Sequence, residues 1–140
     1  NLGRALTTAA IDCPDRMEEE GGVILKNTRN HEEFTFVKVE NVHKGTVTAH
    51  GLYVAEPEDF GKKVIPMLSK GWELYASFHT HPQFSSTPSM LDYDKLFQGF
   101  RYNYIYSTRD REFSCSDWSP QKDLHTVKIK LETLQYYCLA

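Results

Sequence analysis

Apolar positions recur at helical spacing in some parts of the chain and alternate with polar positions in others. Spacings of three and four residues predict helices over 2–11 and 56–69. We interpret Pro66 as a kink near the end of the second helix, which stops at Gly71. A third helix is predicted to begin at Ser89, with an apolar face made of Tyr93, Leu96, Phe97 and Phe100.

Short apolar or alternating runs predict strands at 21–25, 33–41, 46–54, 72–78, 102–107, 111–117 and around 127–131. Gly51 weakens the third of these. One face of the fourth is expected to carry Trp72, Leu74, Ala76 and Phe78. Residues 108–110 join the next two strands as a hairpin, and 132–140 form a short helix or lie along the surface. This order predicts an α/β or α+β fold in which helices pack on a mixed sheet.

The composition is that of one globular domain over residues 1–140. Forty per cent of the residues are hydrophobic, and 16 basic against 19 acidic side chains give a net charge of −3. No block of Lys or Arg favours binding to nucleic acid or to an anionic membrane. No apolar run is long enough to span a bilayer, and no signal-peptide pattern is visible. The first residue is Asn rather than Met, which leaves open a trimmed chain that has lost a targeting segment.

The three cysteines, Cys13, Cys115 and Cys138, lie far apart in the sequence. An odd number at wide spacing is not a disulfide framework, and the absence of a C-x-x-C pair excludes a zinc ribbon or a thioredoxin-type site. We therefore expect reduced, mostly buried thiols in a cytoplasmic protein.

The segment that carries chemistry runs from His79 to Asp92. His79 and His81 are two residues apart at the end of a predicted strand, so their side chains lie on the same face. Asp92, in the first turn of the following helix, can reach the same point. Two imidazoles and a carboxylate are ligands for zinc, and three protein ligands leave a fourth tetrahedral position open, as in catalytic sites.

The same residues carry a family resemblance. The pattern H-x-H-P, six residues, then S-x-x-D resembles the JAMM metalloproteases, also called MPN-plus or JAB domains; its fixed positions here are His79, His81, Pro82, Ser89 and Asp92. That family has an upstream glutamate three residues before a glycine that opens an apolar strand. In this chain Glu19 stands three residues before Gly22.

The resemblance implies a fold and a reaction. The fold would be α/β, a curved mixed sheet flanked by helices, related to the cytidine-deaminase architecture. The reaction would be hydrolysis of a peptide or isopeptide bond, with one zinc ion per chain held by His79, His81 and Asp92. Glu19 would accept a proton from the attacking water and deliver it to the leaving amine. Ser89 would donate a hydrogen bond to the water or the oxyanion.

Some of these residues have a simpler interpretation. Ser89 and Asp92 also have the spacing of a helix capping box. Glu19 stands in an acidic triplet, so a shift of one residue would turn Glu18 or Glu20 inward instead. His31 begins an H-E-x-x pattern, but a threonine replaces the second histidine, which excludes a thermolysin-type site. The remaining histidines have no partners at ligand spacing.

Two functions from different classes remain. The first is an active peptidase on the tail of a ubiquitin-like protein, a sulfur-carrier precursor, or a polypeptide of a defence or phage system. The second is a catalytically silent MPN scaffold; such scaffolds usually lose metal ligands, which this chain keeps. A deaminase is discarded because its H-x-E and P-C-x-x-C pair is missing. The short connections resemble stand-alone prokaryotic or phage-type domains.

Overall fold

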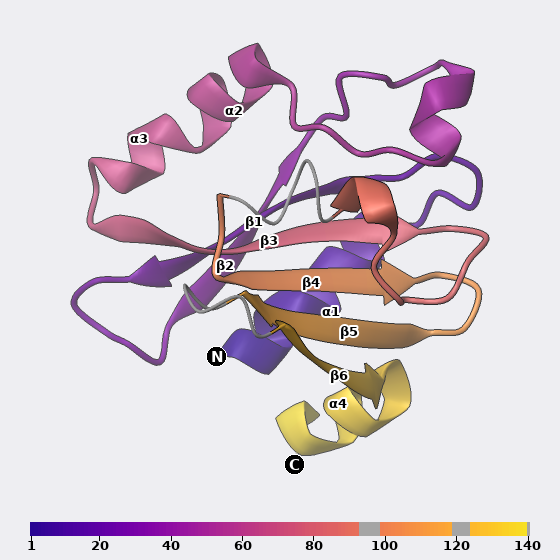
Figure 1. Ribbon diagram of the computed structural model, residues 1–140. Helices are drawn as coiled ribbons and strands as arrows, with labels where there is room; N and C mark the ends of the chain where they lie inside the picture. Colours follow the sequence, from indigo (N-terminus) through magenta and orange to yellow (C-terminus); the bar gives the residue numbers. More distant parts are fainter. Residues whose placement is uncertain (93–98, 119–123, 140) are drawn as a thin grey trace.

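The computed structural model describes residues 1–92, 99–118 and 124–139, and Figure 1 shows the arrangement of these residues. Within them, six strands form one sheet in the order β2-β1-β3-β4-β5-β6. The strands are β1 (Gly21–Asn27), β2 (Phe34–Val39), β3 (Trp72–His81), β4 (Tyr102–Ser107), β5 (Glu112–Trp118) and β6 (Leu124–Lys130). The helices are α1 (Leu2–Asp12), α2 (Pro57–Lys63), α3 (Ile65–Leu68) and α4 (Leu131–Leu139), with a 3-10 turn, η1, at Val47–His50.

The sheet is mixed, as the sequence predicts. All neighbouring strands are antiparallel except β3 and β4, which are parallel. A parallel pair needs a crossover connection, and here the chain crosses between the end of β3 and the start of β4. The predicted α/β class is therefore confirmed, and the crossover is the segment that carries Asp92.

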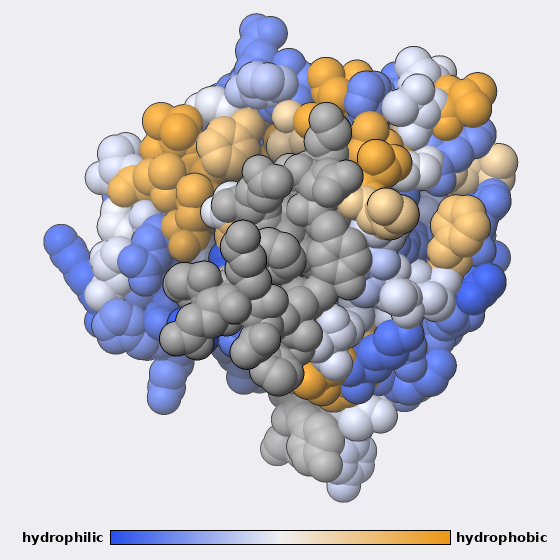
Figure 2. Space-filling model, in the orientation of Figure 1, coloured by the Kyte–Doolittle hydropathy of each residue, from blue (hydrophilic) through white to orange (hydrophobic). Residues whose placement is uncertain are grey.

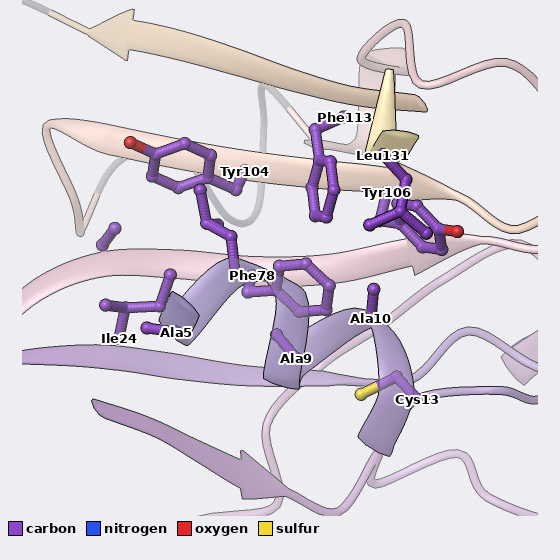
Figure 3. Packing of buried hydrophobic residues seen from close by; sticks show 12 residues of the cluster. Ala5, Ala9, Ala10, Cys13, Ile24, Phe78, Tyr104, Tyr106, Phe113 and Leu131 are labelled. Carbon is purple, nitrogen blue, oxygen red and sulfur yellow. The ribbon is translucent and has the colours of Figure 1, made fainter. Parts of the chain in front are cut away.

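One face of the sheet is covered by α1, which crosses behind the sheet in Figure 1. The side chains of Ala5 and Ala9 are small enough to let this helix approach Phe78 of β3 closely. Figure 3 shows Ala9 facing Phe78, with Phe113 of β5 beyond it. Cys13 closes this cluster; it is a free thiol, and burial raises its pKa to about 12.

The opposite face holds a second apolar cluster, under α2 and α3. Ile24 points to the α1 side, whereas its neighbours Val23 and Leu25 point to this second side and pack with Val39 and Val64. Figure 2 shows apolar side chains gathered at the upper left, where α2 and α3 lie in Figure 1. The histidines of β3 belong to this second face, near its other end. Among the described residues, no helix is sufficiently long and apolar to traverse a membrane.

The predicted strand over 46–54 is wrong. Residues 47–50 form η1 instead, and only an isolated bridge joins Asn41 to Ala55. Gly45, with a φ of 80°, turns the chain before the 3-10 turn. The alternating pattern here comes from local packing rather than from a ladder, because Ala49 is buried and its carbonyl accepts a hydrogen bond from the amide of Glu19.

The predicted helix over 56–69 is present as two pieces. The chain breaks at Val64, between α2 and α3, rather than bending late. Pro66 explains the break, since it has no N–H to continue the ladder of α2 and is favoured in the first turn of a new helix.

The predicted face of the fourth strand is also wrong in part. The pairing of β1 with β3 shifts register between Ile24 and Leu25, so that Tyr75 is skipped. This bulge reverses the alternation. Trp72 packs in the α2–α3 cluster, whereas Ala76 and Phe78 lie in the α1 cluster.

The C-terminal half follows the prediction closely. Strand β4 spans the predicted residues, β5 begins one residue later, and a turn with Arg111 at a φ of 53° joins them. The strand predicted around 127–131 is β6, which begins earlier, at Leu124, and ends at Lys130, because Leu131 opens α4. The end of the chain takes the helical alternative, as α4. The apolar face predicted for the helix after Ser89 falls mainly on residues 93–98, outside the described residues.

The approach of β2 to β1 requires glycine at position 22. A Cβ there would lie 2.1 Å from the carbonyl oxygen of Val37. We expect Gly22→Ala to lower the free energy of unfolding by about 1–3 kcal/mol, because the two strands must separate. Gly61 in α2 has open space around it, so Gly61→Ala should raise that free energy by up to about 1 kcal/mol. Urea unfolding of the two variants measures the difference, and equal midpoints would contradict this account of the strand contact.

Candidate metal centre

Four buried side chains from separate parts of the chain meet at one end of the sheet. Ligand atoms of Glu19, His79, His81 and Asp92 all lie within 4.8 Å of one another. Each residue is at most 3% exposed. Charged groups are rarely buried together unless they are paired or bind a metal ion. Among the described residues, this is the one group of three or more such side chains with the spacing of a metal site.

The length of β3 brings the two histidines to the same place. The strand continues beyond the alternating run at 72–78 and ends at His81, in agreement with the predicted position of the two histidines at its end. It is fixed on both sides, with His79 opposite Gly21 of β1 and His81 opposite Ser107 of β4. The two rings therefore lie on one face, 5.1 Å apart between centroids and edge to face.

Glu19 is the member of the acidic triplet that points inward. Its amide donates to the carbonyl of Ala49 at 2.7 Å, and its own carbonyl accepts from Nδ2 of Asn41 at 3.0 Å. Glu20 instead forms an ion pair with Lys38 at 2.7 Å, and Glu18 accepts from the amide of Gly45. The loop that holds η1 thus sets which glutamate enters the cluster.

Asp92 contacts both histidines. One carboxylate oxygen lies 3.0 Å from Nε2 of His79, and the other lies 3.1 Å from Nε2 of His81. Asp92 also forms the reciprocal capping box with Ser89, whose amide donates to Oδ2 at 2.7 Å while its Oγ accepts from the Asp92 amide at 3.2 Å. The capping and ligand interpretations are therefore compatible, because the cap holds the carboxylate beside the histidines.

The hydrogen bonds of His81 limit the forms of the ring that can face Asp92. Nδ1 of His81 lies 2.8 Å from the carbonyl oxygen of Ser85, which can only accept, so Nδ1 carries a proton. Nε2 then faces Asp92 either as a second N–H of a charged ring or as a bare lone pair. A lone pair beside a carboxylate is repulsive unless a cation lies between them.

Two buried atoms of the cluster make no hydrogen bond of proper geometry. They are Oε1 of Glu19 and Nε2 of His79, which lie 3.9 Å apart; Nε2 of His79 is close to Asp92, at 3.0 Å, but is not aligned with it as in a hydrogen bond. Buried polar atoms are nearly always satisfied, so unpaired atoms that face each other mark a place where something else binds. These donors, two imidazoles and carboxylate oxygens, match the preferences of zinc, and the residues present fit such an ion.

The electrostatics separate the two carboxylates. Burial raises the pKa of Glu19 to about 7, and Asp92 adds to the rise, whereas the two histidines oppose it. Burial alone would also raise the pKa of Asp92, but His79, His81 and the Ser89 amide hold it well below its usual range. Asp92 is therefore suited to remain charged as a ligand, and Glu19 to exchange a proton near neutral pH.

Sequence reasoning missed two contributors. Tyr53 is buried and lies parallel to the His79 ring, with centroids 6.3 Å apart and planes at 7°, and its hydroxyl donates to the carbonyl of Val39. The Ser85 carbonyl orients His81, and a main-chain group of this kind leaves no signal in the sequence. Tyr53 fell inside the segment predicted as a strand, which hid its position beside the site.

An open pocket of about 380 Å³ adjoins the cluster. Its lining includes Glu19, His81 and Ser89, together with Gly51, Phe84, Ser85, Thr87 and Leu91. The buried groups can therefore be reached from this pocket, which Ser89 also lines.

The sheet, the crossover and the buried cluster define an α/β domain with a buried Glu-His-His-Asp group that could hold a metal ion. The chain belongs to the prokaryotic homologs of the JAB domain, whose family model matches residues 6–120. This confirms the family that the H-x-H-P and S-x-x-D spacing predicts.

Solved structures share the fold at low sequence identity. The solution structure of protein DSY2949 from Desulfitobacterium hafniense has a TM-score of 0.63 and 16% identity, covering 91% of this chain and 84% of that one. The solution structure of a protein from Salinibacter ruber has a TM-score of 0.50 and 19% identity, covering 92% and 86%. A search of the curated proteins returns no match.

Proposed function

We propose that this chain is a zinc-dependent peptidase or isopeptidase that cleaves at the C-terminal tail of a ubiquitin-like or sulfur-carrier-type protein. The observation that carries the proposal is the buried cluster of Glu19, His79, His81 and Asp92, in which Oε1 of Glu19 and Nε2 of His79 make no hydrogen bond. Membership of the JAB family supports it, because the complete JAMM motif is retained.

The site residues would have two kinds of role: some bind the ion, and others take part in the reaction. His79, His81 and Asp92 would hold the ion. When bound, zinc supplies a Lewis acid that polarises a carbonyl and lowers the pKa of water. Glu19, with a pKa of about 7, is suited to accept a proton from the attacking water and to pass it to the leaving amine. Ser89 lines the pocket, and its O–H would donate to the developing oxyanion.

A catalytically silent scaffold is the alternative function. A scaffold gains nothing from burying two carboxylates and two imidazoles together, because burial of charge is unfavourable without a ligand. The retained and buried set therefore favours the enzyme. The free thiols of Cys13 and Cys115 are consistent with our placement of this enzyme in the reducing cytoplasm.

The substrate we propose is an extended polypeptide tail. A tail that lies beside an exposed strand gains main-chain hydrogen bonds, which suit a flexible C terminus better than a folded surface. We expect glycines on both sides of the scissile bond, because side chains there would meet the walls around the buried ligands.

The first test is metal content and its effect on stability. Protein purified without chelator should contain about one zinc per chain. Removing the zinc should leave the chain folded but lower its melting temperature, since the metal binds the native state only and the two apolar clusters do not depend on it. Elemental analysis and thermal unfolding measure both effects. A chain that binds no transition metal even after zinc addition is not this enzyme, and one that unfolds completely on chelation has a structural zinc instead.

A further inference from the structure

The loop over residues 82–88 joins the last histidine of β3 to the cap of Asp92, and side chains from the neighbouring strands bind its carbonyl groups. Oγ of Ser107 in β4 donates to the carbonyl of Phe84 at 2.6 Å, and Oγ of Ser114 in β5 donates to that of Ser86 at 2.6 Å. Two more donors, Thr108 and Arg109, bind the carbonyls of Pro82 and Gln83 at 3.1 and 3.2 Å. The loop is therefore fixed by β4, β5 and the turn between them.

The carbonyl of Ser85 lies between the two that the serine hydroxyls bind. It accepts from Nδ1 of His81 at 2.8 Å, as described above. Because the carbonyls on both sides of Ser85 are fixed by separate strands, the peptide planes around it have little freedom to rotate. The orientation of His81 thus depends on hydroxyl groups that do not touch it.

These hydroxyl groups are completely buried, so their hydrogen bonds cannot be replaced by bonds to water. Ser107, Ser114 and Ser86 are each 0% exposed. A buried carbonyl that loses its donor is left unsatisfied, and the segment that carries it then moves to find a partner. Without Ser114, the carbonyl of Ser86 would be released next to the residue that orients His81.

We infer that Ser107 and Ser114 are positioning residues of the metal centre: they fix the loop so that the Ser85 carbonyl holds His81 with Nε2 directed toward Asp92, where the ion would bind. This inference rests on the proposed zinc site. The partner of a metal-bound histidine fixes the tautomer and the ring direction, and its loss typically weakens metal binding about 10–100-fold. Here the groups that fix the direction of the His81 ring are one contact further from the ion than its direct partner, in strands β4 and β5.

Ser116 provides a matched control for Ser114. It lies two residues along β5, on the same face, and is also 0% exposed, but its hydroxyl lies 3.2 Å from Oγ1 of Thr126 rather than from the loop. Ser114→Ala and Ser116→Ala each remove one buried hydroxyl from one strand. They should lower the melting temperature of the metal-free protein to a similar extent.

Zinc affinity, measured by competition with a chromogenic chelator at constant pH, separates the two variants. Ser114→Ala should bind zinc more weakly than the wild type by about 5–10-fold, at or below the lower end of the loss of a direct partner, whereas Ser116→Ala should stay within about 2-fold. The affinity of a fully folded chain does not depend on its free energy of unfolding, so a loss of stability alone would not produce this difference. Ser107→Ala repeats the measurement from the other side of Ser85 and should also lower the affinity for zinc. The test therefore does not require that Ser114→Ala folds.

The outcomes are distinct. If the wild type binds zinc and all three variants match it, the positioning role is overturned and the proposed function stands. If Ser116→Ala lowers the affinity for zinc as much as Ser114→Ala does, the effect comes from a general disturbance of β5, and the inference also fails. If the wild type binds no zinc, the proposed function fails first and the inference with it.

Discussion

Replacing Glu19 with glutamine is expected to leave zinc bound and the fold intact while lowering the rate of hydrolysis by about 10²–10⁴-fold. Glutamine has the size of glutamate but cannot accept a proton, so only the proton-transfer step is lost. The carboxylate lies in the cluster with its Oε1 unpaired, and burial raises its pKa to about 7. Steady-state cleavage of a ubiquitin-like fusion, together with metal analysis, measures the two effects separately.

The neighbouring glutamates provide the controls for this variant. Glu20 is paired with Lys38, and Glu18 accepts from the Gly45 amide, so neither carboxylate belongs to the cluster. We expect Glu20→Gln and Glu18→Gln to retain activity close to that of the wild type, with at most about 1 kcal/mol of stability lost from the ion pair. An inactive Glu20→Gln beside an active Glu19→Gln would place the base one residue later. Full activity of all three would exclude this segment as the source of the base.

Asp92→Ala is expected to abolish tight zinc binding and activity together. Asp92 lies within about hydrogen-bond distance of both histidines, at 3.0 and 3.1 Å, and is the one carboxylate of the cluster that stays charged at low pH. The loss in zinc affinity should exceed the about 10–100-fold that follows the loss of an outer partner, because a direct ligand is removed. Chelator competition measures it.

Ser89→Ala tests whether capping alone explains that effect. The variant removes the hydroxyl that accepts from the Asp92 amide but keeps the carboxylate, so it should lose about 1 kcal/mol of stability and retain zinc. Its rate should fall if the hydroxyl also donates to the oxyanion. If Ser89→Ala lost zinc as completely as Asp92→Ala, the carboxylate would act as a cap that holds the loop and not as a ligand.

Local rules were sufficient for the part of the site that lies on regular structure. The two-residue period of a strand places His79 and His81 together, and the capping spacing places Asp92 one turn after Ser89 within the crossover segment. These relations hold within a few residues, so they can be read from the sequence. The strands of the C-terminal half were predictable for the same reason.

Tertiary contacts decided the rest. Glu19 enters the cluster because its main chain binds Ala49, in the segment 46–54 that the alternating pattern wrongly predicts as a strand, and Asn41, which follows β2. The bulge beside Tyr75 reverses the face of Trp72, and nothing in the local pattern marks a pairing shift with another strand. In the sequence, Ser107 of β4 and Ser114 of β5 are ordinary strand residues. Their role follows only from the loop that packs against them in the fold.

The two unpaired atoms of the cluster have an evolutionary consequence. A buried polar atom without a partner destabilises a fold by about 1–3 kcal/mol, so Oε1 of Glu19 and Nε2 of His79 make the chain less stable than its sheet and helices allow. In a lineage in which the proposed hydrolysis was no longer needed, apolar substitutions at these two positions would be retained, because they would add stability. The buried four-residue group would then be lost before the sheet, and such relatives would keep the fold without the group.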